Sequence, residues 1–279
     1  MGEAIVVGIT DAAVTRRAVD WAAQRAVERR QPLELFTVVG GAVGAVGEDS
    51  LVDAALAQAV ELAEAEASRI ASTGVDVRTR VERGNPVAKL LDASTDAALL
   101  VIGSDYQGSG SRAHRGAHGL RIAAGAHSPV VVIPDFDVAG RTGVVVGVDG
   151  SPVSEKAVAF AAAEADRLHE PLIAVAVWTP LEVPRNMGAY PVQYLENMEK
   201  LTGEALGLSL AGLASRYPDL EIVRRVERGY PSHIINELAG RARLAVVGSH
   251  GRGALARFLL GSISQEVLAR LETATAVVR

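Results

Sequence analysis

Two copies of one unit make up this chain of 279 residues, and the repeat limits the folds that the chain can adopt. Residues 13–39 match residues 152–178 at a constant offset of 139, and later segments match at an offset of 145. A period near 140 residues is far longer than that of solenoid repeats, so each copy can form a domain of its own. A segment with proline, glycine and charged residues separates the copies, and we predict one domain at residues 1–139 and a second at residues 140–279.

Within each copy, short apolar runs alternate with stretches of helical periodicity. In the second copy we expect strands at residues 144–148, 172–178, 220–226, 244–247 and 275–278. We expect helices at residues 153–168, after the second strand, from Pro231 and from about Ser262. Fully apolar strands that alternate with helices indicate a parallel sheet covered on both faces, and right-handed crossovers make this an open, doubly wound α/β fold.

The composition excludes several classes of function. The sequence has no cysteine, so disulfides, thiolate metal sites, iron–sulfur clusters and cysteine nucleophiles are ruled out. A formal net charge of −5 provides no basic surface for DNA or RNA, and we expect no nucleic-acid partner. No apolar run approaches the roughly 18 residues of a membrane span, and the amino terminus lacks the basic flank of a secretory signal. We therefore expect a cytoplasmic protein without membrane contact.

Two polar loops of the second copy carry the candidate chemistry. One follows the first strand, at residues 147–151, and the other follows the fourth strand, at residues 248–262. Doubly wound sheets bind ligands at the carboxyl ends of strands, where the strand order reverses. If the order is 3-2-1-4-5, the first and fourth strands are neighbours and the two loops flank one crevice.

The residue types in these loops suit a nucleotide. Glycines at positions 248, 251, 253 and 261 let backbone N–H groups approach a phosphate closely. We expect Ser262 to be the N-cap of the last helix, with Gln265 completing a capping box, so that a phosphate also meets the positive end of the helix dipole. The carboxylate of Asp149 can accept hydrogen bonds from ribose hydroxyls.

Other sequence signatures do not fit. Residues 251–256 match the G-x-G-x-x-A variant of the dinucleotide fingerprint, but that fingerprint opens a βαβ unit and here only one strand remains. The sequence has no G-x-x-x-x-G-K-[ST] phosphate loop, no G-x-S-x-G nucleophile elbow and no H-E-x-x-H zinc helix. His114 and His118 have the spacing of metal ligands without a third partner nearby, so we assign no metal site. We also assign no catalytic residue.

These residues resemble those of the universal stress proteins, specifically the tandem-domain members of that family. The ATP-binding signature of the family, G-x2-G-x9-G-[ST], is matched by Gly248, Gly251, Gly261 and Ser262, and its first-strand aspartate by Asp149. The resemblance covers both copies and implies a flavodoxin-like (Rossmann-like), five-stranded parallel sheet of order 3-2-1-4-5 in each. It also implies an intramolecular pseudo-dimer, in which the last strands, residues 130–133 and 275–278, pair with each other. A homodimer of the whole chain is left open.

The resemblance further implies ATP as the cofactor, with or without Mg²⁺. By resemblance, the backbone of Val177 would bond to adenine, Asp149 would hold the ribose, and the glycine loop and the last helix would surround the phosphates and the sugar. The predicted nucleotide-binding residues are Gly147, Val148, Asp149, Val177, Val247, Gly248, His250, Gly251, Arg252, Gly253, Gly261, Ser262, Ile263 and Ser264.

The first copy departs from this pattern at its informative positions. Thr10 stands where the second copy has Asp149, with Asp11 shifted by one. Tyr106 replaces Gly251 and Ala117 replaces Ser262, although Gly103 and Gly116 remain. A tyrosine ring would fill the place of a phosphate, and alanine lacks the hydroxyl of serine. We therefore predict that only the second copy binds ATP tightly.

The predicted function is that of an ATP-binding regulatory protein, whose nucleotide occupancy changes a surface that an unknown protein partner reads. The loops offer no recognisable catalytic base or set of metal ligands, so ATP hydrolysis would be slow at most. One alternative is an interaction scaffold without useful nucleotide affinity. Another is binding of AMP or a cyclic nucleotide, because a glycine loop does not distinguish nucleotides by their number of phosphates. The segment at residues 180–194 is an insertion of the second copy, and it is either a lid over the adenine or a surface loop.

Overall fold

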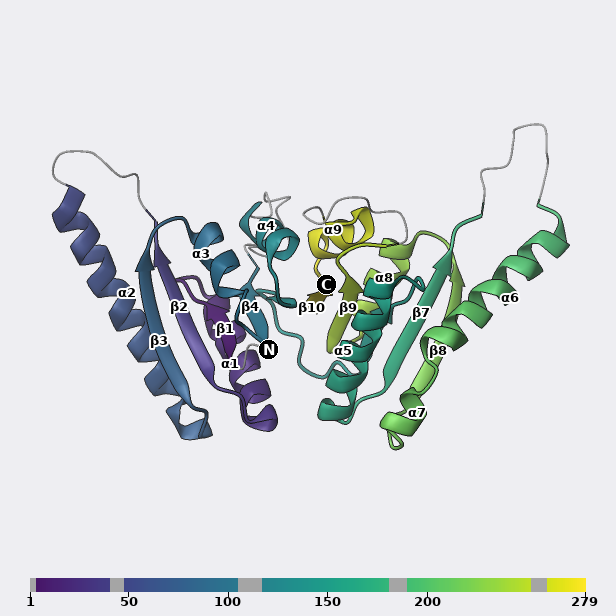
Figure 1. The fold of residues 1–279 in the computed structure, drawn as a ribbon, viewed down its shortest axis with the longest axis horizontal. Coiled ribbons are helices and arrows are strands. Elements are labelled where there is room, and N and C mark those ends of the chain that lie inside the picture. The colour runs from purple at the N-terminus through teal and green to yellow at the C-terminus, as the bar shows by residue number, and fades with distance from the viewer. Residues whose placement is uncertain (1–3, 41–47, 105–116, 181–189, 252–259) are drawn as a thin grey trace. The chain divides into compact units, whose positions relative to one another are not determined.

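The computed structural model describes residues 4–40, 48–104, 117–180, 190–251 and 260–279 (Figure 1). The chain divides into two compact units, Met1–Asp137 and Val138–Arg279. Predicted residues Tyr106, Arg252 and Gly253 and most of the inserted segment lie outside the described residues. The predicted pairing of the last strands of the two units stays a prediction.

The first unit is an alternation of strands and helices. Its elements are β1 (Ile5–Gly8), α1 (Val14–Arg29), β2 (Leu33–Val39), α2 (Glu48–Ile70), a 3₁₀ turn (Ala71–Thr73), β3 (Val77–Arg83), α3 (Pro86–Ala93), β4 (Leu99–Gly103), α4 (Ala117–Gly125) and β5 (Val130–Ile133). All neighbouring strands are parallel and follow the order β3-β2-β1-β4-β5. This is the predicted doubly wound order 3-2-1-4-5.

The second unit repeats this architecture with one additional short helix. Its elements are β6 (Val144–Gly147), α5 (Pro152–Leu168), β7 (Leu172–Trp178), α6 (Val192–Ser209), α7 (Leu213–Arg216), β8 (Ile222–Arg228), α8 (Pro231–Ala239), β9 (Leu244–Gly248), α9 (Ser262–Ala269) and β10 (Ala274–Val278). The parallel order is β8-β7-β6-β9-β10. The predicted fold class is therefore confirmed in both units.

Helix α5 illustrates how the sequence packs against the sheet. Ser151 is its N-cap and accepts a hydrogen bond from the backbone N–H of Ser154, at 3.2 Å. Ala157, Ala161 and Ala165 recur every four residues and are fully buried. Because residues four apart share one helix face, these small side chains let α5 lie close to β6 and β9.

Two local predictions are wrong. The third strand of the second unit runs from Ile222 rather than from residue 220, because Leu220 still belongs to a turn in which its N–H bonds to the carbonyl of Tyr217. Ser262 is not the N-cap of the last helix. Gly261 takes that position in an extended conformation, and its carbonyl accepts the N–H of Gln265, so the expected capping box does not form.

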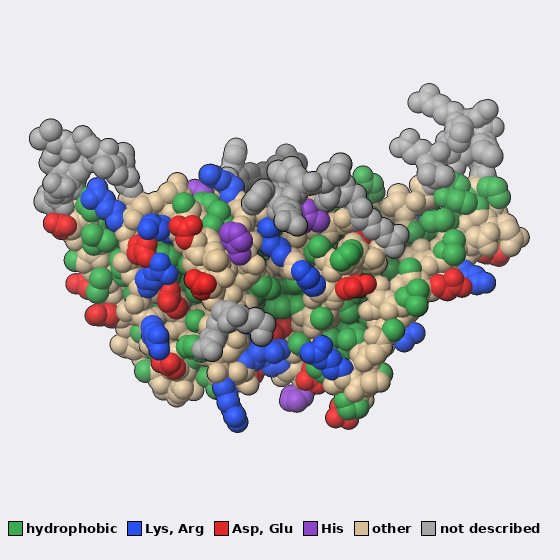
Figure 2. All heavy atoms as spheres, in the orientation of Figure 1, with side chains coloured by type: hydrophobic (Ala, Val, Ile, Leu, Met, Phe, Trp, Pro, Cys, Tyr) green, Lys and Arg blue, Asp and Glu red, His purple; other side chains and the backbone are tan. Residues whose placement is uncertain are grey.

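Acidic and basic side chains are interspersed over the face of the molecule that Figure 2 presents. None of the helices in the described part of the chain is long and apolar enough to cross a membrane.

Candidate functional site

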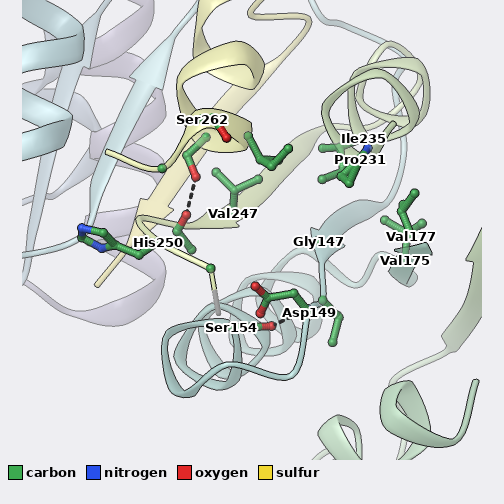
Figure 3. Close-up of a pocket in the computed structure, with 16 residues that line it drawn as sticks. Gly147, Asp149, Ser154, Val175, Val177, Pro231, Ile235, Val247, His250 and Ser262 are labelled. Atoms are coloured by element: carbon green, nitrogen blue, oxygen red, sulfur yellow. Dashed lines mark hydrogen bonds between the residues drawn. The ribbon is translucent and has the colours of Figure 1, made fainter. Parts of the chain in front are cut away.

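A pocket of about 500 Å³ opens at the carboxyl ends of β6, β7 and β9 in the second unit (Figure 3). This volume lies within the usual range for small-molecule sites. Every predicted binding residue that the structure describes lies on its wall, together with four others. The lining residues are Gly147, Val148, Asp149, Ser154, Val175, Val177, Pro231, Ile235, Val247, Gly248, His250, Gly251, Gly261, Ser262, Ile263 and Ser264.

Asp149 is held in place by the turn that follows β6. Its Oδ1 accepts the N–H of Ser151 at 2.9 Å, and its own N–H donates to the hydroxyl of Ser154 at 3.1 Å. The other carboxylate oxygen, Oδ2, would lie 2.7 Å from a Cβ built on Gly251. The carboxylate therefore has one oxygen bound to the turn and one left to accept a ligand hydroxyl, and a side chain at position 251 would displace that second oxygen.

The amino end of α9 forms the opposite wall. Within the described residues no side chain caps this end, because Gly261 is the N-cap and has no side chain. The hydroxyl of Ser264 donates to the carbonyl of Gly248, which ties the helix to the end of β9. The first N–H groups of a helix have no intrahelical partner and carry a partial positive charge, so this end suits an anion.

His250 stands at the edge of the pocket beside this helix end. Its Nδ1 lies 2.8 Å from the hydroxyl of the buried Ser249, a contact that fixes the orientation of the imidazole ring. Figure 3 shows His250 and Ser262 on the side of the pocket away from the apolar side chains of Val175, Val177, Pro231 and Ile235.

The remaining wall is apolar and includes residues that the sequence analysis missed. Val175 and Val177 come from β7, and Pro231 and Ile235 from α8. Val175 could have been predicted from the sequence, because it lies two residues before the predicted Val177 and such residues share one face of a strand. Pro231 and Ile235 carry no motif, and their place depends on how α8 crosses the sheet.

The close approach of α8 depends on Gly147. A Cβ at this position would lie only 2.8 Å from Cδ1 of Ile235. Glycine at the end of β6 thus lets α8 pack near enough to form one side of the pocket.

The first unit builds the same turn without the acid. The N–H of Thr10 donates to the hydroxyl of Thr15 at 3.1 Å, and the Thr10 hydroxyl accepts the N–H of Ala12 at 3.2 Å. These bonds match those of Asp149, so a neutral hydroxyl stands where the second unit has a carboxylate. Phe36 occupies the place of Val175 and is fully buried.

No group of three or more potential ligand side chains is arranged for a metal ion in the described residues. Asp149 is the only carboxylate among the described residues that line the pocket. A divalent cation would therefore need most of its ligands from a bound phosphate chain or from water.

The two units define a class of protein. Each is a doubly wound, parallel Rossmann-like domain, and the chain carries two of them in tandem. The chain belongs to the universal stress protein family, because the model of that family matches residues 1–134 and 141–279.

Relatives and solved structures agree with this membership. A universal stress protein of Mycolicibacterium smegmatis is 34% identical over 99% of this chain and 96% of its own length. One from Mycobacterium tuberculosis is 33% identical over 95% of this chain and 91% of its own length. The crystal structure of a universal stress protein from Archaeoglobus fulgidus superposes with a TM-score of 0.72 at 17% identity, covering 98% of this chain and 95% of that chain. This last likeness concerns the fold alone.

Proposed function

We propose that the second unit binds ATP and that the protein is a nucleotide-dependent regulatory factor of the stress response. The observation that carries the proposal is the combination of three surfaces in one pocket: an apolar wall, the carboxylate of Asp149 and the uncapped amino end of α9. A base, a ribose and a phosphate chain need these three surfaces. Membership of the universal stress protein family supports the same assignment.

The proposed role of ATP is regulatory rather than catalytic. Asp149 and His250 are the only titratable side chains among the described lining residues. Phosphoryl transfer needs a residue that positions the attacking group and several groups that neutralise the developing charge. With so few groups we expect hydrolysis to be slow at most. Mg²⁺ would arrive with the phosphates.

We further propose one ATP site per chain. Thr10 removes the carboxylate that would hold the ribose in the first unit, and Phe36 places a larger buried side chain where the second unit has the pocket residue Val175. The differences at Tyr106 and at Ala117 point the same way, as sequence differences alone.

Isothermal titration of the full chain with ATP tests the proposal. We expect one site per chain, loss of binding in Gly261→Trp, and unchanged binding in Gly116→Trp, the equivalent position of the first copy. Circular dichroism verifies that both variants fold. Two equivalent sites per chain, or normal binding by folded Gly261→Trp, would contradict the proposal.

Mass spectrometry of the purified protein separates the alternatives. Co-purified AMP or a cyclic nucleotide would replace ATP as the ligand. No adenine nucleotide, together with no thermal shift at millimolar ATP, would favour the interaction scaffold instead.

A further inference from the structure

The third strand of each unit presents an arginine beside the position at which the first unit has Phe36 and the second has Val175. In the first unit, Arg80 on β3 pairs in register with Phe36 on β2. In the second unit, Arg225 on β8 pairs in register with Val175 on β7. Residues that are paired across neighbouring strands point to the same face of a sheet. In both units, therefore, an arginine lies beside the same position of the second strand, and only the first unit has an aromatic ring at that position.

In the first unit the arginine covers the ring. The Cζ atom of Arg80 lies 4.4 Å from the centroid of Phe36, which is the geometry of a cation–π contact. Glu34 pairs with Arg80 at 3.3 Å, and Glu82 forms a second, closer ion pair with it. Lys89 pairs with Glu82 at 2.7 Å, and hydrogen bonds from Lys89 and Arg80 hold the pKa of Glu82 below its ordinary value. Arg80 is thus fixed over a ring that belongs to the protein itself.

In the second unit both the ring and much of this network are gone. Val175 lines the pocket in place of the phenylalanine, and Ile173 stands where the first unit has Glu34. In the described part of the chain, Arg225 forms a long ion pair with Glu227, at 3.7 Å. The two side chains are 48% and 39% exposed. Arg225 is therefore held far less tightly than Arg80.

We propose that Arg225 stacks on the base of the nucleotide bound in the second unit, as Arg80 stacks on Phe36 in the first. This inference rests on the proposed function. Neighbouring strands lie about 4.8 Å apart, so an arginine side chain on β8 spans the distance to a ring placed over β7. The guanidinium of arginine is planar and stacks on aromatic faces. In this role Arg225 favours a ligand that carries an aromatic base, such as a nucleotide.

Arg225→Ala tests this role, and the same strand supplies a matched control. Arg224 is also exposed, but it precedes Arg225 and so lies on the opposite face of β8. We expect Arg225→Ala to weaken ATP binding about threefold to thirtyfold, the range of exposed to desolvated cation–π contacts. Arg224→Ala should leave the ATP dissociation constant within about twofold of that of the unaltered protein, because it removes the same charge far from the base.

A nucleotide series decides whether Arg225 acts on the base or on the phosphates. Titrations with ATP, ADP and AMP should show the same fold loss in Arg225→Ala, because all three share the base. The loss should also persist at high salt, which screens a phosphate contact more than a stacking contact. A loss that grows with the number of phosphates and vanishes at high salt would overturn the proposal, as would equal effects of Arg225→Ala and Arg224→Ala.

The outcome for the unaltered protein separates this inference from the proposed function. If the full chain binds no adenine nucleotide, the proposed function fails. If it binds ATP and Arg225→Ala binds equally well, the function stands and the role of Arg225 is wrong. Thermal unfolding of each variant verifies that the exposed substitutions leave the fold intact.

Discussion

Gly251 lies close to the carboxylate of Asp149. A Cβ at position 251 would come within 2.7 Å of Oδ2 of Asp149. Alanine at position 251 must therefore displace this carboxylate, whose oxygen we propose holds the ribose. We therefore expect Gly251→Ala to weaken ATP binding about tenfold, which corresponds to the loss of about one hydrogen bond. Isothermal titration measures the change.

Gly207 supplies the control for this substitution. It lies inside α6, and a Cβ there would have open space around it. Gly207→Ala should leave ATP affinity unchanged and raise the free energy of unfolding by about 0.5–1 kcal/mol, because alanine loses less backbone entropy than glycine in a helix. Unchanged ATP affinity in Gly251→Ala would show that the carboxylate does not hold the ligand.

The sequence predicted that two loops far apart in the chain flank one crevice, and Gly248, Gly251, Gly261 and Asp149 do line one pocket. Their role in binding stays a prediction. The prediction for Ser262 was wrong by one residue, because serine is a common N-cap and the local sequence does not reveal that the extended Gly261 already takes that role.

Strand β7 determines how much of the pocket is open. Val175→Phe places in the second unit the residue that the first unit has at the same position. We expect the added ring to extend into the apolar wall and to reduce ATP binding by at least an order of magnitude, while the fold, which accommodates Phe36 in the first unit, persists. A folded Val175→Phe protein that binds ATP normally would place the base elsewhere.

Helices α8 and α9 are neighbours that both contribute residues to the pocket wall, and a side-chain bond joins them. The hydroxyl of Ser232 on α8 donates to Oε2 of Glu266 on α9. The first unit has Val87 and Arg121 at these positions, so the bond belongs to the second unit. A double-mutant cycle of Ser232→Ala and Glu266→Ala should give a coupling of about 1 kcal/mol in the free energy of unfolding. Additive effects of the two substitutions would mean that the bond contributes nothing.

Element order could be predicted from apolar periodicity because most strands are buried on both faces and read as continuous apolar runs, although the edge strands β3 and β8 carry exposed arginines. The contribution of α8 to the pocket could not, because Ile235 reaches it only through the close packing that Gly147 permits. Contacts of this kind depend on the crossing of a helix over a sheet, which leaves no local pattern in the sequence.

At the scale of the whole molecule, the chain carries two units of similar fold, and the pocket proposed for the nucleotide lies in the second. If ATP occupies the second unit alone, its stabilising effect should appear there first. At a concentration 100 times the dissociation constant, ligand binding adds about 2.7 kcal/mol to the unit that binds it. Hydrogen exchange with mass spectrometry can assign this gain to segments of the chain.

We expect ATP to slow amide exchange at residues 147–154 and in α9, and to leave the equivalent residues 8–15 and α4 unchanged. The reason is that Gly147, Asp149 and the amino end of α9 line the pocket proposed for the nucleotide, whereas the first unit has Thr10 and Phe36 where the second has Asp149 and Val175. Gly261→Trp in the same experiment should abolish the protection. Equal protection of both sets would mean that Thr10 and Phe36 do not prevent binding, and that each unit of this universal stress protein holds a nucleotide.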